Sequence, residues 1–268
     1  MLNRRSFITA MLAAPMVIYA GAALALPKTT LLGVFPGLGA PNITAYQFTD
    51  DVRPFTQKLS ALSGVKISPE LYSTLYSIKK ASLAQSPGML LLPFTGSVYA
   101  EQHGYTPVLM STGHADDVCV KRIGVRVKNI ASLRHGTFLN AIAQIATEST
   151  PGAKIVVMQI EDAIKQSLTL GVGIEAGTMS RKSAEPFLAS GKFEIMTNSP
   201  AVPSYVLLIR NDMMETSNKI IAGADGIQEA TIAGLQDDMP RPVGKFIKYD
   251  EANYLSFKTK FIKEFSEN

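Results

Sequence analysis

The stretch MLLLPFTGSVYAEQHGYTPVLM, residues 89–110, places two apolar runs on either side of a turn and a short helix. Residues 89–92 are uninterrupted in their apolar character, which predicts a strand that is buried on both faces. Residues 93–96 predict a loop, a helix follows as far as Gln102, and residues 106–110 form a second apolar strand. Strands of this kind that alternate with helices are typical of a parallel α/β sheet covered by helices on both faces.

The same alternation continues on both sides of this stretch. Thr30 to Phe35 is a short apolar run that Pro36 and Gly37 end. Further strands are expected at 65–72, 118–127, 154–159, 172–174, 193–197 and 204–210, and further helices at 49–64, 75–85, 142–147, 160–168 and 185–189. A last helix should pack on the core, because aromatic residues recur in it at helical spacing; they are Tyr254, Phe257, Phe261 and Phe265.

The first 25 residues have the pattern of a secretory signal. Arg4 and Arg5 give it a positive start, an uncharged and mostly apolar stretch follows, and residues 23–25 match a small-x-small cleavage site. The arginine pair lies in NRRSFIT, which resembles a twin-arginine export motif, so both that route and the general secretory route stay open. We expect export and a mature chain that starts near Leu26 and does not span the membrane. A retained anchor helix is the alternative.

Cysteine usage narrows the expected location. Cys119 is the only cysteine, so no disulfide can form within the chain. No cysteine follows the signal, which excludes a lipid anchor on an N-terminal cysteine. We therefore expect a freely diffusing protein in the periplasm of a Gram-negative bacterium.

Charge and motifs exclude several function classes. The net charge is +4 over 268 residues, and the two arginines of the signal supply half of it. This is too mild to indicate a nucleic-acid partner. The three histidines, His103, His114 and His135, have no metal-ligand spacing. Because phosphate-loop and nucleophile motifs are also absent, we expect neither a cofactor, nor a metal, nor catalysis.

Several phrases, in this order, resemble the phosphonate-type solute-binding proteins of ABC importers. They are GVFPG at 33–37, FTQKLSALSGVKISPELY at 55–72, MLLLPFTGSVYAEQHGYTPVL at 89–109, VKNIASLRHGTF at 127–138 and NSPAVPSYVLLIRNDM at 198–213. The fourth phrase corresponds to an exposed segment of that family, and the fifth to its second hinge crossing. The match covers nearly all of the mature chain.

The resemblance implies a fold and a function. The fold is α/β, with two Rossmann-like lobes and a hinge, the transferrin-like architecture of type II periplasmic binding proteins. Lobe 1 would consist of residues 26–116 and 205–268, and lobe 2 of residues 117–204. The function would be capture of a small polar or anionic solute, of the phosphonate or phosphate-like oxyanion class, for an ABC permease.

One departure concerns the anion-binding turn of that family, which offers backbone N–H groups and hydroxyls at a helix start. Here Gly136 is followed by TFLNAIAQIATEST, which runs almost directly into a helix. Thr137 and Asn140 are the polar candidates that remain.

Ligand contacts are expected where strands end and helices begin, because free N–H groups gather there. In lobe 1 the candidates are Phe35 after the first strand, Tyr72 after the second, and Thr95, Ser97 and Tyr99 around the next helix start. The alternatives are loop packing for Phe35, helix capping for Ser97 and packing inside the lobe for Tyr99.

In and near lobe 2 the candidates are Thr137, Thr178, Ser180, Arg181 and Tyr205. The hydroxyls and the guanidinium of the 178–181 segment could hold an anion, and an ordinary surface loop is the alternative. Tyr205 flanks the second hinge crossing.

Three rival functions stay open. The protein could signal to a membrane histidine kinase, and a Cys119 thiolate would suit an arsenite sensor, although a buried, inert thiol is the alternative for Cys119. It could also be an exported enzyme, or an interaction protein without a transport role on the same fold.

Overall fold

The computed structural model describes residues 29–37, 44–252 and 255–266 of the chain. The predicted signal over residues 1–25 and its cleavage site lie outside these residues. Among the helices in the described ranges, none is both long and apolar enough to cross a membrane.

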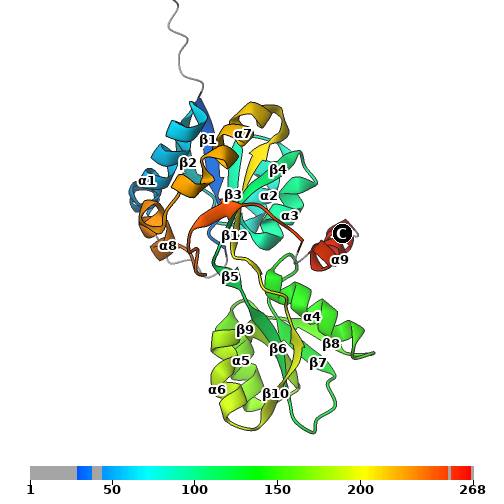
Figure 1. The fold of residues 1–268 in the computed structure, drawn as a ribbon. Coiled ribbons are helices and arrows are strands. Elements are labelled where there is room, and N and C mark those ends of the chain that lie inside the picture. Colours follow the sequence, from blue (N-terminus) through cyan, green and yellow to red (C-terminus); the bar gives the residue numbers. More distant parts are fainter. Residues whose placement is uncertain (1–28, 38–43, 253–254, 267–268) are drawn as a thin grey trace, which may run out of the picture.

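Two α/β lobes, stacked end to end in Figure 1, each contain one sheet. Lobe 1 has six strands in the order β13-β4-β12-β3-β1-β2. Its strands are β1 (Thr29–Val34), β2 (Lys66–Leu71), β3 (Met89–Pro93), β4 (Tyr105–Ser111), β12 (Tyr205–Arg210) and β13 (Phe246–Lys248). Its helices are α1 (Ala45–Ser63), α2 (Leu75–Leu83), α3 (Phe94–Glu101), α7 (Met214–Ala222) and α8 (Ala233–Asp238), with 3₁₀ turns at Asn211–Met213, Ala224–Gly226 and Glu229–Ile232.

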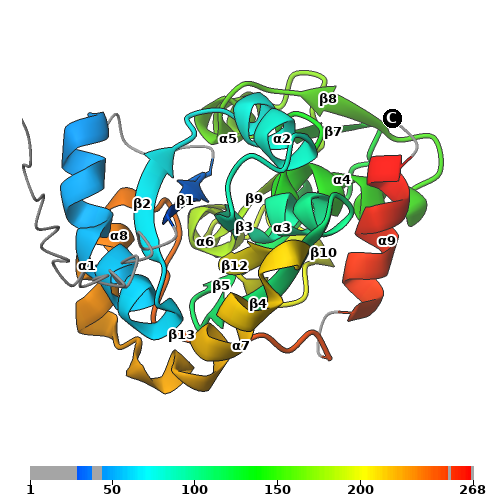
Figure 2. The same cartoon turned by 90° about the horizontal axis from the view of Figure 1, so that it is seen from above.

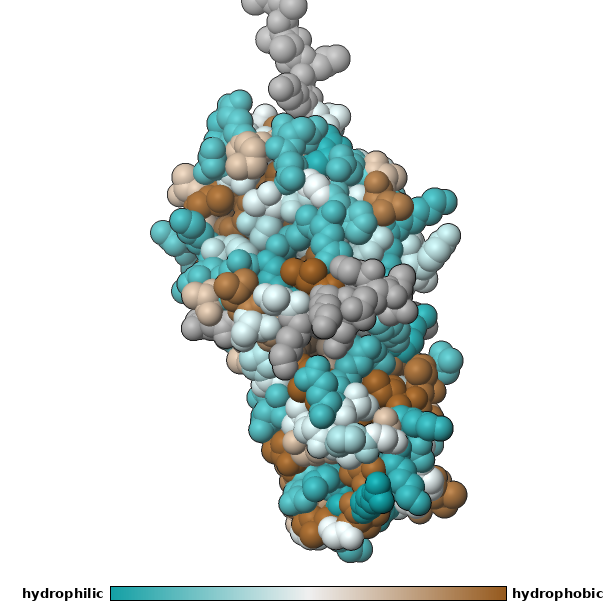
Figure 3. Space-filling view, turned by 90° about the vertical axis from the view of Figure 1, so that its right-hand side faces the viewer, coloured by the Kyte–Doolittle hydropathy of each residue, from teal (hydrophilic) through white to brown (hydrophobic). Residues whose placement is uncertain are grey.

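Lobe 2 has five strands in the order β10-β6-β9-β7-β8. Its strands are β6 (Asp117–Arg122), β7 (Asn129–Ser132), β8 (Lys154–Val157), β9 (Ala176–Ser180) and β10 (Phe193–Asn198). Its helices are α4 (Phe138–Glu148), α5 (Glu161–Leu170) and α6 (Arg181–Ala189). Exposed apolar residues such as Val157, Leu170 and Val172 belong to this lobe, and hydrophobic surface is scattered over its face in Figure 3.

The apolar run of β3 lies in the centre of lobe 1, as its sequence predicts. Met89 and Leu91 pack with α1 and α8 on one face, whereas Leu90 and Leu92 pack with α2 and α3 on the other. All four side chains are fully buried. This confirms a sheet that helices cover on both faces.

The expectation of a parallel sheet is wrong for part of each lobe. β1 is parallel to β2 and β3, and β7 is parallel to β8 and β9. By contrast, β12 is antiparallel to β3 and β4, and β6 is antiparallel to β9 and β10. The reason is topological: β6 and β12 follow the two crossings between lobes and enter their sheets against the local strand direction.

Two segment predictions also fail locally. Residues 172–174 form no strand, because Gly171 and Gly173 both adopt a positive φ of 69° and turn the chain before β9. The exposed segment expected at 127–138 contains the buried strand β7.

Two short strands, β5 (His114–Ala115) and β11 (Val202–Pro203), pair antiparallel between the two sheets. The crossing requires a glycine at position 113, because a Cβ there would lie 1.9 Å from the carbonyl oxygen of Pro242.

The lobe boundaries at 116/117 and 204/205 stay a prediction.

The C-terminal helix α9 (Leu255–Ser266) lies beside α3 and α4 (Figures 1 and 2). Its Phe257 joins Phe94 of lobe 1 and Phe138 of lobe 2, with ring centroids 6.1 and 5.6 Å away; we call these three the phenylalanine cluster. The predicted core role of Phe257 is therefore confirmed. Next to it, the Lys258 ammonium donates to Glu101 at 2.5 Å.

We predict that Phe257→Ala lowers the free energy of unfolding by about 3–5 kcal/mol, because it removes a buried ring from a cluster that joins both lobes. The matched control is Leu255→Ala on the same helix, where the side chain is 49% exposed and the change should stay within about 0.5 kcal/mol. Equilibrium urea unfolding measures both. Equal, small effects would contradict a structural role for α9.

We predict that Cys119 does not react with a thiol reagent at pH 8 in the native protein and reacts fully in guanidinium chloride. Its side chain is fully buried, and burial raises the pKa of its thiol to about 12, so little thiolate forms. Absorbance of the released chromophore measures the reaction. Rapid reaction of the native protein would reopen a soft-metal role for this residue.

Candidate ligand-binding site

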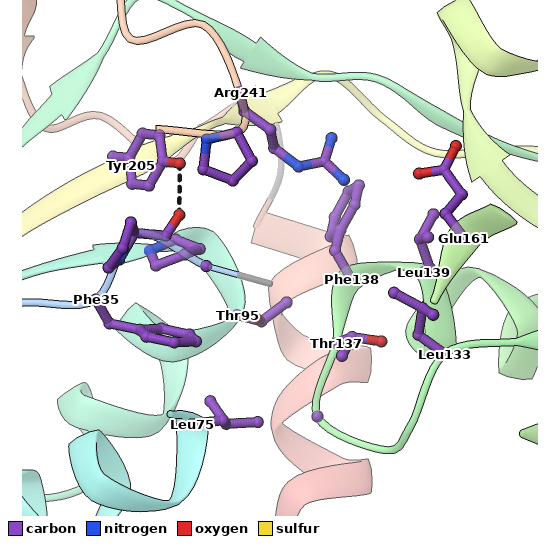
Figure 4. A pocket seen from close by; sticks show the side chains of 15 residues that line it. Phe35, Leu75, Thr95, Leu133, Thr137, Phe138, Leu139, Glu161, Tyr205 and Arg241 are labelled. Atoms are coloured by element: carbon purple, nitrogen blue, oxygen red, sulfur yellow. Dashed lines mark hydrogen bonds between the residues drawn. The ribbon is translucent and has the colours of Figure 1, made fainter. Parts of the chain in front are cut away.

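A cavity of about 100 Å³ lies between the two lobes. Figure 4 shows its lining. Lobe 1 contributes Phe35, Pro36, Gly37, Leu75, Pro93, Thr95, Tyr205, Pro240 and Arg241, and lobe 2 contributes Leu133, Gly136, Thr137, Phe138, Leu139 and Glu161. Most of these residues follow the carboxyl ends of β1, β3, β7 and β8 or begin α2, α3, α4 and α5, which is where open α/β sheets bind ligands.

Lobe 1 fixes its part of the lining through backbone bonds. The Phe35 N–H donates to the carbonyl of Leu91 at 3.1 Å, which holds the end of β1 against β3. The buried hydroxyl of Tyr205 donates to the Pro36 carbonyl at 2.8 Å (Figure 4). Burial raises the pKa of Tyr205, so this hydroxyl stays a donor.

The first turn of α3 lies at the cavity and has no side-chain cap. Pro93 stands at its N-cap position and makes no side-chain capping bond. Pro93 has an extended ψ of 155°, and α3 begins directly after it at Phe94, three residues ahead of the expected Ser97. As a result Thr95, which is 6% exposed, lines the cavity in the first turn.

Lobe 2 uses its own polar groups to build the loop before α4. The Thr137 hydroxyl accepts from the Asn140 N–H at 3.1 Å and donates to the Arg134 carbonyl at 2.9 Å. The Asn140 amide donates to the Leu133 carbonyl at 2.9 Å. Gly136 turns this loop with a φ of 84°. The side chains of Thr137 and Asn140, the two polar candidates of this turn, therefore stabilise the turn through these hydrogen bonds.

A buried ion pair joins the lobes at the cavity wall. The Arg241 guanidinium donates to both carboxylate oxygens of Asp117, at 2.8 and 2.6 Å. Asp117 has no exposed side-chain surface, whereas Arg241 is 25% exposed. Burial raises the pKa of Asp117, and the arginine beside it opposes this rise. The guanidinium also stands 5.9 Å from the ring centre of Phe138.

Glu161 is the other charged residue of the lining. It begins α5, and Figure 4 shows its carboxylate on the side of the cavity toward which Arg241 points. Its Oε1 atom is buried and has no hydrogen-bond partner within the described structure. In the described ranges, no group of three or more His, Cys, Asp or Glu residues is placed to hold a metal ion.

Of the ten predicted contact residues, the structure brings four to the cavity: Phe35, Thr95, Thr137 and Tyr205. Three other candidates lie within lobe 1 or at its surface. The Ser97 hydroxyl donates to the Phe94 carbonyl at 2.7 Å inside α3. The Tyr72 hydroxyl donates to Glu70 at 2.9 Å, and the Tyr99 ring stacks on His103 with centroids 4.3 Å apart.

The 178–181 segment also lies away from the cavity lining, because its polar groups bond within lobe 2 and to the hinge. The Thr178 hydroxyl donates to Ser132 at 2.9 Å. Ser180 caps α6, and Arg181 pairs with Asp116 at 2.6 Å. This segment is strand β9 and the start of α6, rather than a loop that follows a strand.

Sequence reasoning missed both charged residues of the lining. Arg241 lies between Pro240 and Pro242. Two prolines restrict the backbone around this arginine, and that feature could have marked it as a candidate site residue. Glu161 follows the predicted strand at 154–159, so the strand-end rule that selected Thr95 could have selected it too.

Neither a family model nor a curated protein matches the sequence. Solved structures do match in fold. The XAC2383 protein of Xanthomonas citri, solved bound to ATP, aligns with a TM-score of 0.65 at 10% identity, over 90% of this chain and 98% of that one.

Two binding proteins align less closely. A binding protein component of an ABC phosphonate transporter from Pseudomonas aeruginosa has a TM-score of 0.53 at 11% identity, over 88% of each chain. SsuA, the periplasmic aliphatic sulphonate binding protein of Escherichia coli, has a TM-score of 0.56 at 13% identity, over 90% of this chain and 93% of that one. At these identities the likeness establishes the fold, which is the two-lobed α/β fold of the periplasmic solute-binding proteins.

Proposed function

We propose that this protein is an exported solute-binding protein that captures a small molecule between its lobes and delivers it to the permease of an ABC importer. The observation that carries the proposal is the interlobe cavity, because its lining comes from both lobes. A solute in that cavity contacts both lobes at once, and such contacts favour the closed arrangement over an open one.

The structural neighbours support this role and the location. One is a component of an ABC phosphonate transporter, and SsuA is periplasmic. The predicted export signal fits the same compartment. Among the described residues, the charged groups of the cavity lining are one carboxylate and one guanidinium, which can bind a polar solute.

The hinge supports closure as a movement of whole lobes. Two short crossings connect the sheets, and each is bonded to the other: the Ser204 N–H donates to Gly113 at 2.8 Å and the Ser199 N–H to Asp117 at 3.0 Å. Few residues therefore absorb the rotation, as in other hinged proteins. The Asp117–Arg241 pair spans the same junction.

The oxyanion class that the resemblance implies stays a prediction. A phosphonate or phosphate would have to bind through α3 amides and Thr95, because Arg241 is already engaged with Asp117. Binding experiments should therefore include both anionic and cationic solutes.

We predict that Arg241→Gln lowers the free energy of unfolding by about 3–5 kcal/mol, because it leaves Asp117 buried without its cation. Arg181→Gln is the matched control, since Arg181 and Asp116 form an ion pair at the same junction with side chains 40% and 45% exposed. That variant should lose less than about 1 kcal/mol. Chemical unfolding measures both, and equal losses would contradict the buried role of Arg241.

We predict that protein purified from its native host carries a small molecule, and that adding this molecule to stripped protein reduces the radius of gyration and raises Tm. Binding to the closed form alone stabilises that form by mass action. Mass spectrometry of the denatured protein identifies the molecule, and X-ray scattering measures the compaction. A protein that carries nothing and does not compact with any solute would refute the proposal.

A further inference from the structure

Two charged residues belong to the described part of the cavity lining, Arg241 and Glu161. Arg241 is held by Asp117 through two hydrogen bonds. Nearby, Arg181 pairs with Asp116. On α5, Lys165 pairs with Asp162 at 2.5 Å. These three cations each have a carboxylate partner, whereas no ion pair is formed by Glu161 within the described structure.

One oxygen of the Glu161 carboxylate lacks a partner, while the residue as a whole is partly buried. Its Oε1 atom is cut off from solvent, and no described donor bonds to it. A buried oxygen without a hydrogen bond is unfavourable, and more so when it is charged. Arg241 and Lys165 both lie near enough to feel its charge, yet each donates to another carboxylate instead.

The surroundings of Glu161 suit a cation with a short apolar part. The lining around it is apolar, with Leu133, Leu139 and the ring of Phe138 on the same side of the cavity (Figure 4). An aromatic face already attracts a cation here, because the Arg241 guanidinium stands over the Phe138 ring. Opposite, Thr95 and the uncapped first turn of α3 can bond an oxygen atom of the solute.

We propose that the solute is a small amino alcohol whose ammonium group binds Glu161 and whose hydroxyl faces Thr95 and the start of α3. This inference rests on the proposed function, since it names the solute class of the same cavity. The cavity of about 100 Å³ is smaller than the roughly 150 Å³ that holds a benzene molecule. The solute therefore has only a few non-hydrogen atoms.

An oxyanion fits this lining less well. Helix starts at α3 and α4 each offer about half a positive charge, but Thr137 caps α4 and Glu161 itself occupies the start of α5. A full negative charge on the solute would face the unpaired carboxylate. It would gain a guanidinium only by displacing Asp117, which is fully buried.

The test uses probes of nearly equal size that differ in charge. Ethanolamine is cationic, ethylene glycol neutral and glycolate anionic, and methylphosphonate represents the oxyanion class. Calorimetric titration and Tm are measured for the wild-type protein with each. We expect ethanolamine to bind and raise Tm, and the other three to bind at least about tenfold more weakly.

The variant Glu161→Gln keeps the shape of the side chain and removes its charge. We expect it to weaken ethanolamine binding about tenfold or more, with its own Tm in the absence of probe equal to or above that of the wild type. Glu185→Gln is the matched control, because Glu185 is an exposed carboxylate of the same lobe on α6. It should bind ethanolamine as the wild type does.

The outcomes separate this inference from the proposed function. Binding of glycolate or methylphosphonate in preference to ethanolamine, with compaction, overturns the amino-alcohol inference and leaves solute capture standing. Equal ethanolamine affinity in the Glu161→Gln variant also overturns it. If no probe binds and the host-purified protein carries no solute, both proposals fail.

Discussion

The buried pair of Asp117 and Arg241 ties together parts of the chain that are 124 positions apart. Asp117 is the first residue of β6, where the first crossing enters lobe 2, and Arg241 follows α8 in lobe 1. The charge of Asp117, which is fully buried, would be strongly unfavourable without the guanidinium. The cavity wall, the register of the crossing and the charge left to a solute all depend on these two hydrogen bonds.

The pair also explains why the cavity differs from what the hydroxyl-rich helix start suggested. A guanidinium with a free fork would be a strong site for an oxyanion. Here the Arg241 guanidinium already donates to the Asp117 carboxylate. In the loop before α4, the Thr137 hydroxyl and the Asn140 amide form hydrogen bonds within the loop. What remains open to a solute is the start of α3, an apolar wall and one carboxylate.

Sequence patterns predicted those strands whose burial follows from their own residues. The apolar run of β3 was enough to place it at the centre of a covered sheet, and the same rule found β1 and β12. Strand direction was not predictable from such runs, because β6 and β12 owe theirs to the crossings between lobes. Likewise β7 is short and begins with the polar Asn129, so its burial depends on neighbours rather than on its own pattern.

The candidate site was also only partly predictable: residues that follow strands were found, whereas residues placed by distant contacts were missed. Thr95 and Phe35 follow strands and lie at the cavity, as strand-end reasoning expects. Arg181 has the right chemistry but the wrong surroundings, since Asp116 and Asn198 take its donors. The position of Arg241 at the cavity depends on its ion pair with Asp117, which is 124 positions away in sequence. No rule based on local spacing could predict that pair.

The position of α9 has a mechanical consequence. The crossings attach the lobes at the hinge, and the phenylalanine cluster attaches them a second time beside α3 and α4. Both attachments belong to one hydrophobic cluster, which also contains Ala115 and Val202 of the crossings. A movement that separates the lobes beside α3 and α4 therefore has to displace α9 or expose part of this cluster to water.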